Sequence, residues 1–326
     1  MASAAENKKN QKSGKAMNNE DEINVSISLF AMFDMREEKN IYQEQGKEMY
    51  TKYDQQHAHQ LLKPGAAFPF AKALMMVNSY LKFLHPESQE LFKILLMVPS
   101  ELHPGTRLKR SIEFFEFPRE AVVIREFGST AKLIDELKSS GSKLYLSENT
   151  KPDGAEYGIP AATVSVSDVR MDLNNFQLRV AFDGDGIIFS DEAEKITQKK
   201  GLEAFFQHEE TNRDKPLPKG PLSGFLEVLM KLQAKFRAEK MIKNCPIRTY
   251  LVTSRGLMKS GARVMNSLEH WGMEIDEAHF LSGGHKAPVL QAIKPQIFFD
   301  DQMRHVLAAR EAGIVGAHVP YGVANE

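Results

Sequence analysis

The sequence predicts an α/β protein with two tandem halves, each built on a parallel sheet with helices on both faces. Short apolar runs alternate with helical patterns through both halves, and this alternation is typical of parallel sheets. Pieces of the first half recur in the second half in the same order. In the second half, paired aspartates directly follow two of the apolar runs. The fold class rests on these three observations.

The chain divides into three predicted segments. Residues 1–22 are rich in Lys, Asn, Ser and Ala and contain almost no large apolar side chain, so we expect a disordered tail. Residues 23–168 form the first half and residues 169–326 the second half. Both halves have the size of an ordinary domain.

Five stretches of the first half match stretches of the second. The strongest match pairs residues 105–115 with residues 261–271, in which Gly, Arg, Ser and Glu recur at one constant spacing. The later of these stretches has the apolar spacing of an amphipathic helix. The other matched pairs are 94–98 with 249–253, 64–74 with 220–229, 143–148 with 296–301, and 158–164 with 313–319. Repeats in the same order predict a duplication.

The second half begins with an apolar strand that ends in Asp183 and Asp185. At the carboxyl end of a strand the chain leaves the pleat, so both carboxylates can point into one crevice. Two acids there have a high electrostatic cost unless a cation or a phosphoryl group shares the site. The pattern therefore indicates metal-assisted phosphoryl transfer. The alternative is a simple turn, because Asp and Gly are also turn residues.

Three further polar groups follow later apolar runs. The stretch at residues 248–255 reads as a buried strand that ends in the hydroxyls of Thr253 and Ser254, and either hydroxyl could donate to a phosphoryl oxygen. We favour Thr253 because it ends the apolar run. Lys286 lies in a Gly-rich turn before a helix and could neutralise phosphate charge. Asp300 and Asp301 end another apolar run. Helix capping is the alternative for the hydroxyls and acids, and a solvated side chain is the alternative for the lysine.

The order Asp-x-Asp, Thr/Ser, Lys, Asp-Asp resembles that of the haloacid dehalogenase-like phosphatase superfamily, so both halves are expected to be Rossmann-like. Further stretches are similar to the cytosolic 5′-nucleotidases of type I. These stretches are residues 42–46, 64–70, 178–185, 245–253, 297–303 and 317–322. The resemblance runs from about Ile23 to the end of the sequence.

The resemblance implies a Mg²⁺ ion held by Asp183, by the backbone carbonyl of Asp185, and by one or both of Asp300 and Asp301. Hard oxygen ligands suit this ion.

The resemblance also implies a covalent mechanism. Asp183 would attack phosphorus and form an aspartyl-phosphate. Asp185 would give a proton to the departing oxygen and then take one from the hydrolytic water. Thr253 would hydrogen-bond a phosphoryl oxygen, and Lys286 would neutralise the charge that builds on it.

A mostly helical, charged insertion at about residues 190–219 follows the Asp-x-Asp strand. In related nucleotidases this region is the small cap that selects the substrate. The candidates for binding the nucleoside are Phe205, Phe206, His208, Glu209 and Asn212, with Ser254 and Arg255 as second contacts. The aromatic rings of Phe205 and Phe206 suit stacking on a base, although both side chains could instead form the core of the cap. His208 has no partner at metal-ligand spacing, so no zinc site is predicted.

The first half lacks the ligands of the second. In the sequence pairing, the positions of Asp183, Asp185, Thr253, Lys286, Asp300 and Asp301 are taken by Ile27, Leu29, Met97, Thr130, Ser147 and Glu148. The register of the first strand is open by about one residue. The first half is therefore predicted to be a degenerate, catalytically silent copy.

Composition excludes several classes of function. With 42 Lys+Arg against 43 Asp+Glu, the chain is nearly neutral, which argues against nucleic acid or an anionic membrane as partner. Cys245 is the single cysteine, so an intramolecular disulfide is excluded. No apolar run has the length of a membrane span, and the amino terminus lacks the apolar core of a signal peptide. We expect a cytoplasmic protein.

The predicted function is a Mg²⁺-dependent 5′-nucleotidase that hydrolyses nucleoside 5′-monophosphates to nucleoside and phosphate. The alternatives are a phosphatase for another small phosphomonoester and a nucleotide-responsive regulatory protein. The resemblance implies a possible nucleotide effector, bound by the first half or at its interface with the second. Duplicated halves and family analogy favour a homo-oligomer. The sequence does not rank the nucleobases or sugars.

Overall fold

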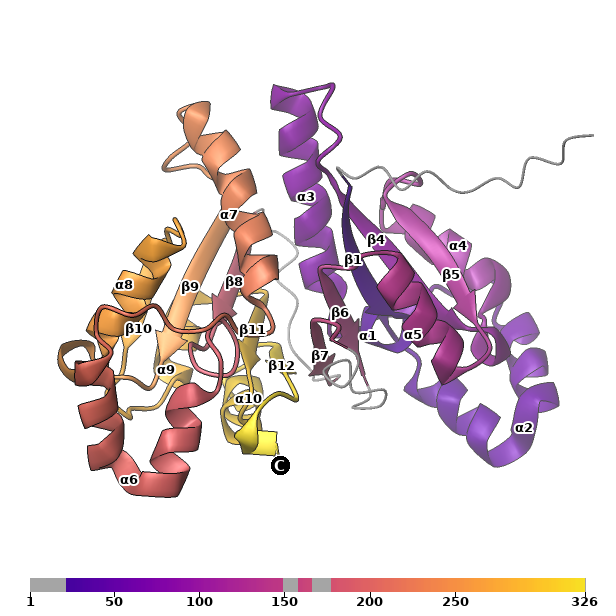
Figure 1. Ribbon diagram of the computed structural model, residues 1–326. Helices are drawn as coiled ribbons and strands as arrows, with labels where there is room; N and C mark the ends of the chain where they lie inside the picture. Colours follow the sequence, from indigo (N-terminus) through magenta and orange to yellow (C-terminus); the bar gives the residue numbers. More distant parts are fainter. Residues whose placement is uncertain (1–21, 149–157, 166–176, 326) are drawn as a thin grey trace, which may run out of the picture.

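The structure is a computed structural model that describes residues 22–148, 158–165 and 177–325. The predicted disordered tail, apart from Glu22, lies outside the described residues. The described chain is an α/β fold around a ten-stranded, mostly parallel sheet (Figure 1). Its strands are β1 (Ile23–Ser28), β4 (Phe92–Pro99), β5 (Val122–Phe127), β6 (Leu144–Ser147), β7 (Ala161–Val164), β8 (Leu178–Phe182), β9 (Ile247–Thr253), β10 (Glu277–Phe280), β11 (Ile297–Asp300) and β12 (Gly316–His318).

The ten strands run in the order β10-β9-β8-β11-β12-β7-β6-β1-β4-β5. Outward from the centre, β12-β11-β8-β9-β10 on one side and β7-β6-β1-β4-β5 on the other follow the same sequence order. All these neighbouring strands are parallel except β7 and β12, which pair antiparallel. The sequence predicts one sheet for each half, whereas the structure joins both into one sheet through this pair.

The backbone hydrogen bonds settle the register of the first strand. Leu178 opens β8 and donates to the carbonyl just before β9, and Ile23 opens β1 and donates to the carbonyl just before β4. These two residues therefore correspond, which places Ser28 opposite Asp183 in the comparison of halves. The sequence pairing of Asp183 with Ile27 is wrong by one residue, because a one-residue shift turns every backbone group toward the other neighbour.

Helices cover both faces of the sheet. They are α1 (Leu29–Met32), α2 (Arg36–Gln56), α3 (Phe68–Leu84), α4 (Gly105–Phe114), α5 (Thr130–Ser139), α6 (Glu192–Thr211), α7 (Ser223–Ala238), α8 (Ala262–His270), α9 (Ala287–Ile293) and α10 (Met303–Glu311). A short antiparallel pair, β2 (Phe33–Asp34) and β3 (Lys63–Pro64), lies outside the main sheet. Among the described residues, no helix is long and apolar enough to cross a membrane.

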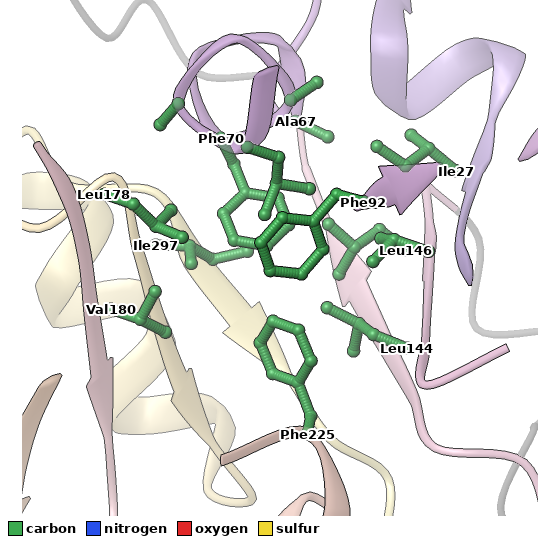
Figure 2. Close-up of a cluster of buried hydrophobic side chains, with 14 of the residues drawn as sticks. Ile27, Ala67, Phe70, Phe92, Leu144, Leu146, Leu178, Val180, Phe225 and Ile297 are labelled. Carbon is green, nitrogen blue, oxygen red and sulfur yellow. The ribbon is translucent and has the colours of Figure 1, made fainter. Parts of the chain in front are cut away.

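One apolar core runs through both halves. α3 of the first half and α7 of the second meet at the centre, where the ring centroids of Phe70 and Phe225 lie 6.2 Å apart. Figure 2 shows these rings packed with Leu144 and Leu146 from β6 and with Val180 from β8. Apolar burial of this kind is the main stabilising contribution to folding. The two halves therefore share a core rather than standing as separate units.

The predicted helical insertion of the second half is α6, and α2 takes the same place in the first half. The sequence analysis did not identify the helical segment of the first half. Both helices bend at a glycine with φ of 83°, Gly46 in α2 and Gly201 in α6. Glycine adopts this backbone conformation without the steric cost that a side chain would add. In Figure 1 both bent helices lie at the lower side of the molecule.

Gly220 holds the segment that follows Asp185 in place. Its amide donates to the carbonyl of Ile188 at 2.7 Å. A Cβ added to Gly220 would lie 2.5 Å from the carbonyl oxygen of Ile187 and also against that of Phe189. The backbone of residues 187–189 therefore has room for glycine alone at this position.

We expect Gly220→Ala to lower the free energy of unfolding by about 1–3 kcal/mol, the usual cost of forcing extra volume into a packed site. Gly224→Ala is the matched control, because an added Cβ there meets nothing within 4 Å. The control should be neutral or slightly stabilising, since alanine favours a helix. Thermal unfolding of both variants checks this, and equal unfolding temperatures would contradict it.

Candidate active site

Three neighbouring strands bring predicted site residues to one edge of the sheet. Asp183 directly follows β8, Thr253 ends β9 and Asp300 ends β11. β8 lies between the other two strands and is parallel to both, so these carboxyl ends meet. The amide of Asp183 donates to the carbonyl of Phe299 at 2.8 Å, which fixes the turn after β8. Gly184 lets this turn approach Thr253, since an added Cβ would lie 3.3 Å from its Oγ1.

Lys286 joins two of these acids. It is the N-cap residue of α9 and only 3% exposed. Its Nζ lies 2.8 Å from Oδ1 of Asp183 and 2.6 Å from Oδ2 of Asp300. Burial alone would lower the pKa of Lys286, but the two carboxylates outweigh it and raise the pKa. The lysine therefore stays charged in the interior.

Asp300 uses both carboxylate oxygens within the protein. The amide of Gln302 donates to Oδ1 at 2.9 Å, and Nδ1 of His305 lies 3.1 Å from Oδ2, which Lys286 also contacts. Burial alone would raise the pKa of Asp300, but Lys286 and His305 outweigh it and lower the pKa. The sequence analysis missed His305. Its place in the first turn of α10, just after the Asp-Asp pair, was the available signal.

Asp301 differs from Asp300 both in its contacts and in the direction in which its pKa is shifted. It is 1% exposed, and neither carboxylate oxygen has a hydrogen-bond partner in the described part of the chain. Burial, together with the charges of Asp183 and Asp300, raises its pKa to about 9. Gly186 has φ of 75° and makes room for this carboxylate, because an added Cβ would lie 2.5 Å from its Oδ2.

The unpaired carboxylate of Asp301 fits a hard divalent cation. Carboxylate oxygens are the ligands such ions prefer, and a cation would supply the positive charge that the protein does not. Asp183, Asp300 and His305 also place one ligand atom each within 4.8 Å of one another. However, the ammonium of Lys286 already contacts both acids of that group. Asp301 together with Asp183 is therefore the better place for a metal ion.

Asp183 is buried and would be costly to ionise alone. Burial raises its pKa to about 7, against the lowering effect of Lys286, and the neighbouring acids Asp300 and Asp185 add to the rise. A cation beside this carboxylate would favour its ionised form.

Asp185 faces an arginine rather than the other acids. Arg255 Nε donates to Oδ2 of Asp185 at 2.8 Å, and Nη2 donates to Oδ1 at 2.8 Å. The remaining nitrogen, Nη1, donates to Glu209 of α6 and to the carbonyl of Ser260. Burial opposes the charge, but the two acids raise the pKa of Arg255. The sequence analysis took Arg255 and Glu209 as substrate contacts, whereas the structure pairs them with each other.

A cavity of about 550 Å³ opens beside this site, between α6 and the loop after β9. Its lining is mostly apolar and includes the predicted residues Phe205, Phe206, Ser254 and Arg255. The ring centroids of Phe205 and Phe206 lie 5.3 Å apart, and Lys259 Nζ lies 4.7 Å from the centroid of Phe206. The other lining residues are Leu202, Gly256, Leu257, Met258, Lys259, Ser260, Phe280, Ser282 and Gly283.

These other lining residues were not predicted. Five of the nine follow Arg255 directly, and four of these lie in the π-helical turn η3 (Leu257–Gly261). Such turns are rare and are found frequently at functional sites. Met258 of this turn is 91% exposed although it lines the cavity. Adjacency to the Thr-Ser-Arg strand end was the only signal in the sequence.

His208 and Asn212 do not line the cavity. Nε2 of His208 lies 2.8 Å from Oε1 of Glu192, and Nδ2 of Asn212 donates to the carbonyl of His208 at 2.9 Å. Both side chains thus bond within the helical segment. Together with Glu209, they are the three predicted nucleoside contacts that the structure does not bring to the cavity.

Buried acids and a lysine that meet at the strand ends of a parallel sheet define a class of phosphoryl-transfer site. Within that class, the chain belongs to the 5′-nucleotidase family, because a family model of this description matches residues 15–326. It is also 42% identical over 300 residues to "Cytosolic 5'-nucleotidase 1B" of Homo sapiens, an alignment that covers 91% of this chain and 48% of that protein. The predicted family resemblance is confirmed. The chain spans about half the length of this relative, and no solved structure has a significant match.

The raised pKa of Asp301 generates a pH prediction. The unfolded chain releases this proton near the ordinary value of 3.8 and the folded protein near about 9, so the folded state binds more protons in between. The stability of the metal-free protein should therefore fall as the pH rises through this window. Asp301→Asn should weaken the dependence and stabilise the metal-free protein near neutral pH, because an amide takes up no proton on folding.

Thermal unfolding across pH, with and without Mg²⁺, checks this. Mg²⁺ should stabilise the unmodified protein and not the Asn variant. Asp135→Asn, an exposed position on α5, is the matched control and should behave like the unmodified protein. A variant that Mg²⁺ still stabilises would remove Asp301 from the metal site.

Proposed function

We propose that the protein is a cytosolic, Mg²⁺-dependent 5′-nucleotidase that hydrolyses nucleoside 5′-monophosphates to nucleoside and phosphate. Family membership and the name of the human relative support this activity and place. The observation that carries the proposal is the meeting of Asp183, Lys286 and Asp300 beside the unpaired carboxylate of Asp301.

Asp183 is the nucleophile. Its carboxylate attacks phosphorus in line, the bond from phosphorus to the 5′-oxygen breaks, and the phosphoryl group remains on Asp183. Asp185 gives a proton to the departing 5′-oxygen. Water then attacks the phosphoryl group, Asp185 takes a proton from it, and phosphate leaves with Asp183 restored. Lys286 already contacts Asp183 and lies where charge builds on the phosphoryl oxygens.

Asp183 and Asp301 would hold a Mg²⁺ ion with their side chains, and Asp185 would contribute its backbone carbonyl. A cation bound there would lower the repulsion between the nucleophile and the phosphoryl group. Asp300 has a different task, because its oxygens are occupied by Gln302, His305 and Lys286. It positions the lysine.

Thr253 and Ser254 take separate roles. Thr253 is buried, and its Oγ1 faces the turn at Gly184 and accepts the amide of Arg255 at 3.2 Å. Ser254 lines the cavity instead. Thr253 is therefore the phosphate contact, and Ser254 lies on the nucleoside side.

The cavity next to α6 holds the nucleoside, and α6 acts as the cap. Its apolar lining suits the faces of a nucleobase, with Leu202 and Met258 on the side open to solvent. The two halves arose by duplication, and the first half is catalytically silent. The shared strand order on both sides of β7 and β12 supports this. So do Ser28, Ser147 and Glu148, which stand where the second half has its acids.

Asp183→Asn should abolish phosphate release from nucleoside monophosphates, because an amide is not a nucleophile toward phosphorus. We expect a loss of at least about 10³-fold in kcat, with thermal unfolding showing an intact fold. Asp135→Asn serves again as the control and should keep the full rate. Release measured with Mg²⁺ and with EDTA tests the metal at the same time. A variant that retains most of the rate would sink the assignment.

Phe206→Ala should raise KM for nucleoside monophosphates by about 10-fold, the usual worth of one stacked ring. It should leave the hydrolysis of β-glycerophosphate unchanged, since that ester has no base. A KM effect of the same size on both compounds would favour a phosphatase for another small phosphomonoester.

A further inference from the structure

We propose that Arg255 is a positioning residue that ties the Asp185 carboxylate to the position of α6. The inference rests on the proposed function, since it assigns to Arg255 a task in that reaction. Glu209 is the residue of α6 to which Arg255 bonds. The three side chains form one ionic chain from the acid–base residue to the cap.

The geometry of the Arg255 guanidinium supports a fixed bridge. Two of its nitrogens form parallel hydrogen bonds to Asp185, both of 2.8 Å, and the third bonds to Glu209 and to the carbonyl of Ser260. Arg255 is 5% exposed and Glu209 is 2% exposed, so water has little access to the bond between them. Bidentate pairs of this kind set the orientation of a carboxylate as well as its charge.

A comparison of the two halves shows which buried arginine ion pairs serve the fold, because such pairs occur in both halves. In the second half, Arg263 contacts Glu192 and Glu209, each at 2.9 Å. In the first half, Arg107 contacts Glu38 at 3.0 Å and Asp54 at 3.3 Å. This arginine bridge holds the bent helix in both halves and is therefore architectural.

The two halves also share a hydrogen bond one turn further along α8 and α4. Ser267 Oγ donates to the carbonyl of Arg263 at 2.6 Å, and Ser111 Oγ donates to that of Arg107 at 2.8 Å. The arginine bridge thus has its surroundings in common between the halves.

Arg255 has no such counterpart. The corresponding loop of the first half, between Val98 and Gly105, contains no arginine. The loop of the second half is one residue longer, and the extra residue takes the form of the π-helical turn Leu257–Gly261, whose Ser260 carbonyl accepts from Arg255. The first half therefore keeps the bridge that holds its helix and lacks both the arginine and the acid that it would orient.

Arg255→Lys provides the test, because one ammonium cannot form two parallel bonds to Asp185 and also reach Glu209. Glu209 keeps its bond to Arg263, so the cap helix stays attached. We expect kcat for a nucleoside monophosphate to fall by about 100-fold, the cost of a misplaced catalytic group, with little change in KM. p-Nitrophenyl phosphate has a leaving group that needs no proton. Its release in the first turnover, before Asp185 acts as a base toward water, should therefore fall by less than about 10-fold.

Arg107→Lys is the matched control. It alters the same kind of buried bridge in the first half and should lower the unfolding temperature without changing either rate. If Arg255→Lys does not fold, Glu209→Gln tests the other end of the chain. It should give a smaller loss with the same dependence on the leaving group.

Equal losses in the first-turnover release of the two leaving groups, or a rise in KM alone, would overturn the inference. If the unmodified protein releases phosphate from neither compound, the proposed function fails and this inference fails with it. An active parent enzyme whose variant loses both activities equally overturns only the inference.

Discussion

The ammonium of Lys286, held between Asp183 and Asp300, is the interaction on which the site depends. A buried lysine without acids would lose its charge, and these acids without the lysine would take up protons. The parallel order of β8 and β11 sets the two carboxylates side by side, and the start of α9 supplies the cation. One lysine cannot neutralise three acids. Burial and the neighbouring acids therefore raise the pKa of Asp301 to about 9, and this imbalance supports the proposed metal ion.

Buried arginines balance the acidic charge of the helices α2 and α6 in the same way. Arg263 and Arg107 hold α6 and α2 to their halves through matched pairs with acids. Such pairs are costly to bury, and removal of one partner leaves an uncompensated charge. Arg255 stands apart, because one of its acids, Asp185, belongs to the turn after β8 and the other, Glu209, to α6. Its position makes the proposed cap and the proposed reaction centre parts of one electrostatic network.

The sequence predicted what depends on local pattern. Asp183, Thr253 and Asp300 follow apolar strands, and parallel strands must bring such ends together, so their meeting was foreseeable. The register of β1 was not, because a strand buried on both faces shows no alternation that would fix it. Glu209 pairs with Arg263, which is remote in sequence, and Asn212 bonds back to His208 at the end of α6. The local sequence indicates neither direction. Likewise, nothing local in the Leu257–Gly261 stretch indicated a π-helical turn, and nothing in β7 or β12 indicated that they pair.

The antiparallel pair of β7 and β12 also has a consequence for synthesis on the ribosome. β7 is complete early, whereas its neighbour β12 is translated only after nearly all of the second half. Until then the nascent first half presents an open sheet edge to water and to other chains. Open edges of this kind recruit foreign strands. This edge is thus open to aggregation for as long as the second half is being synthesised.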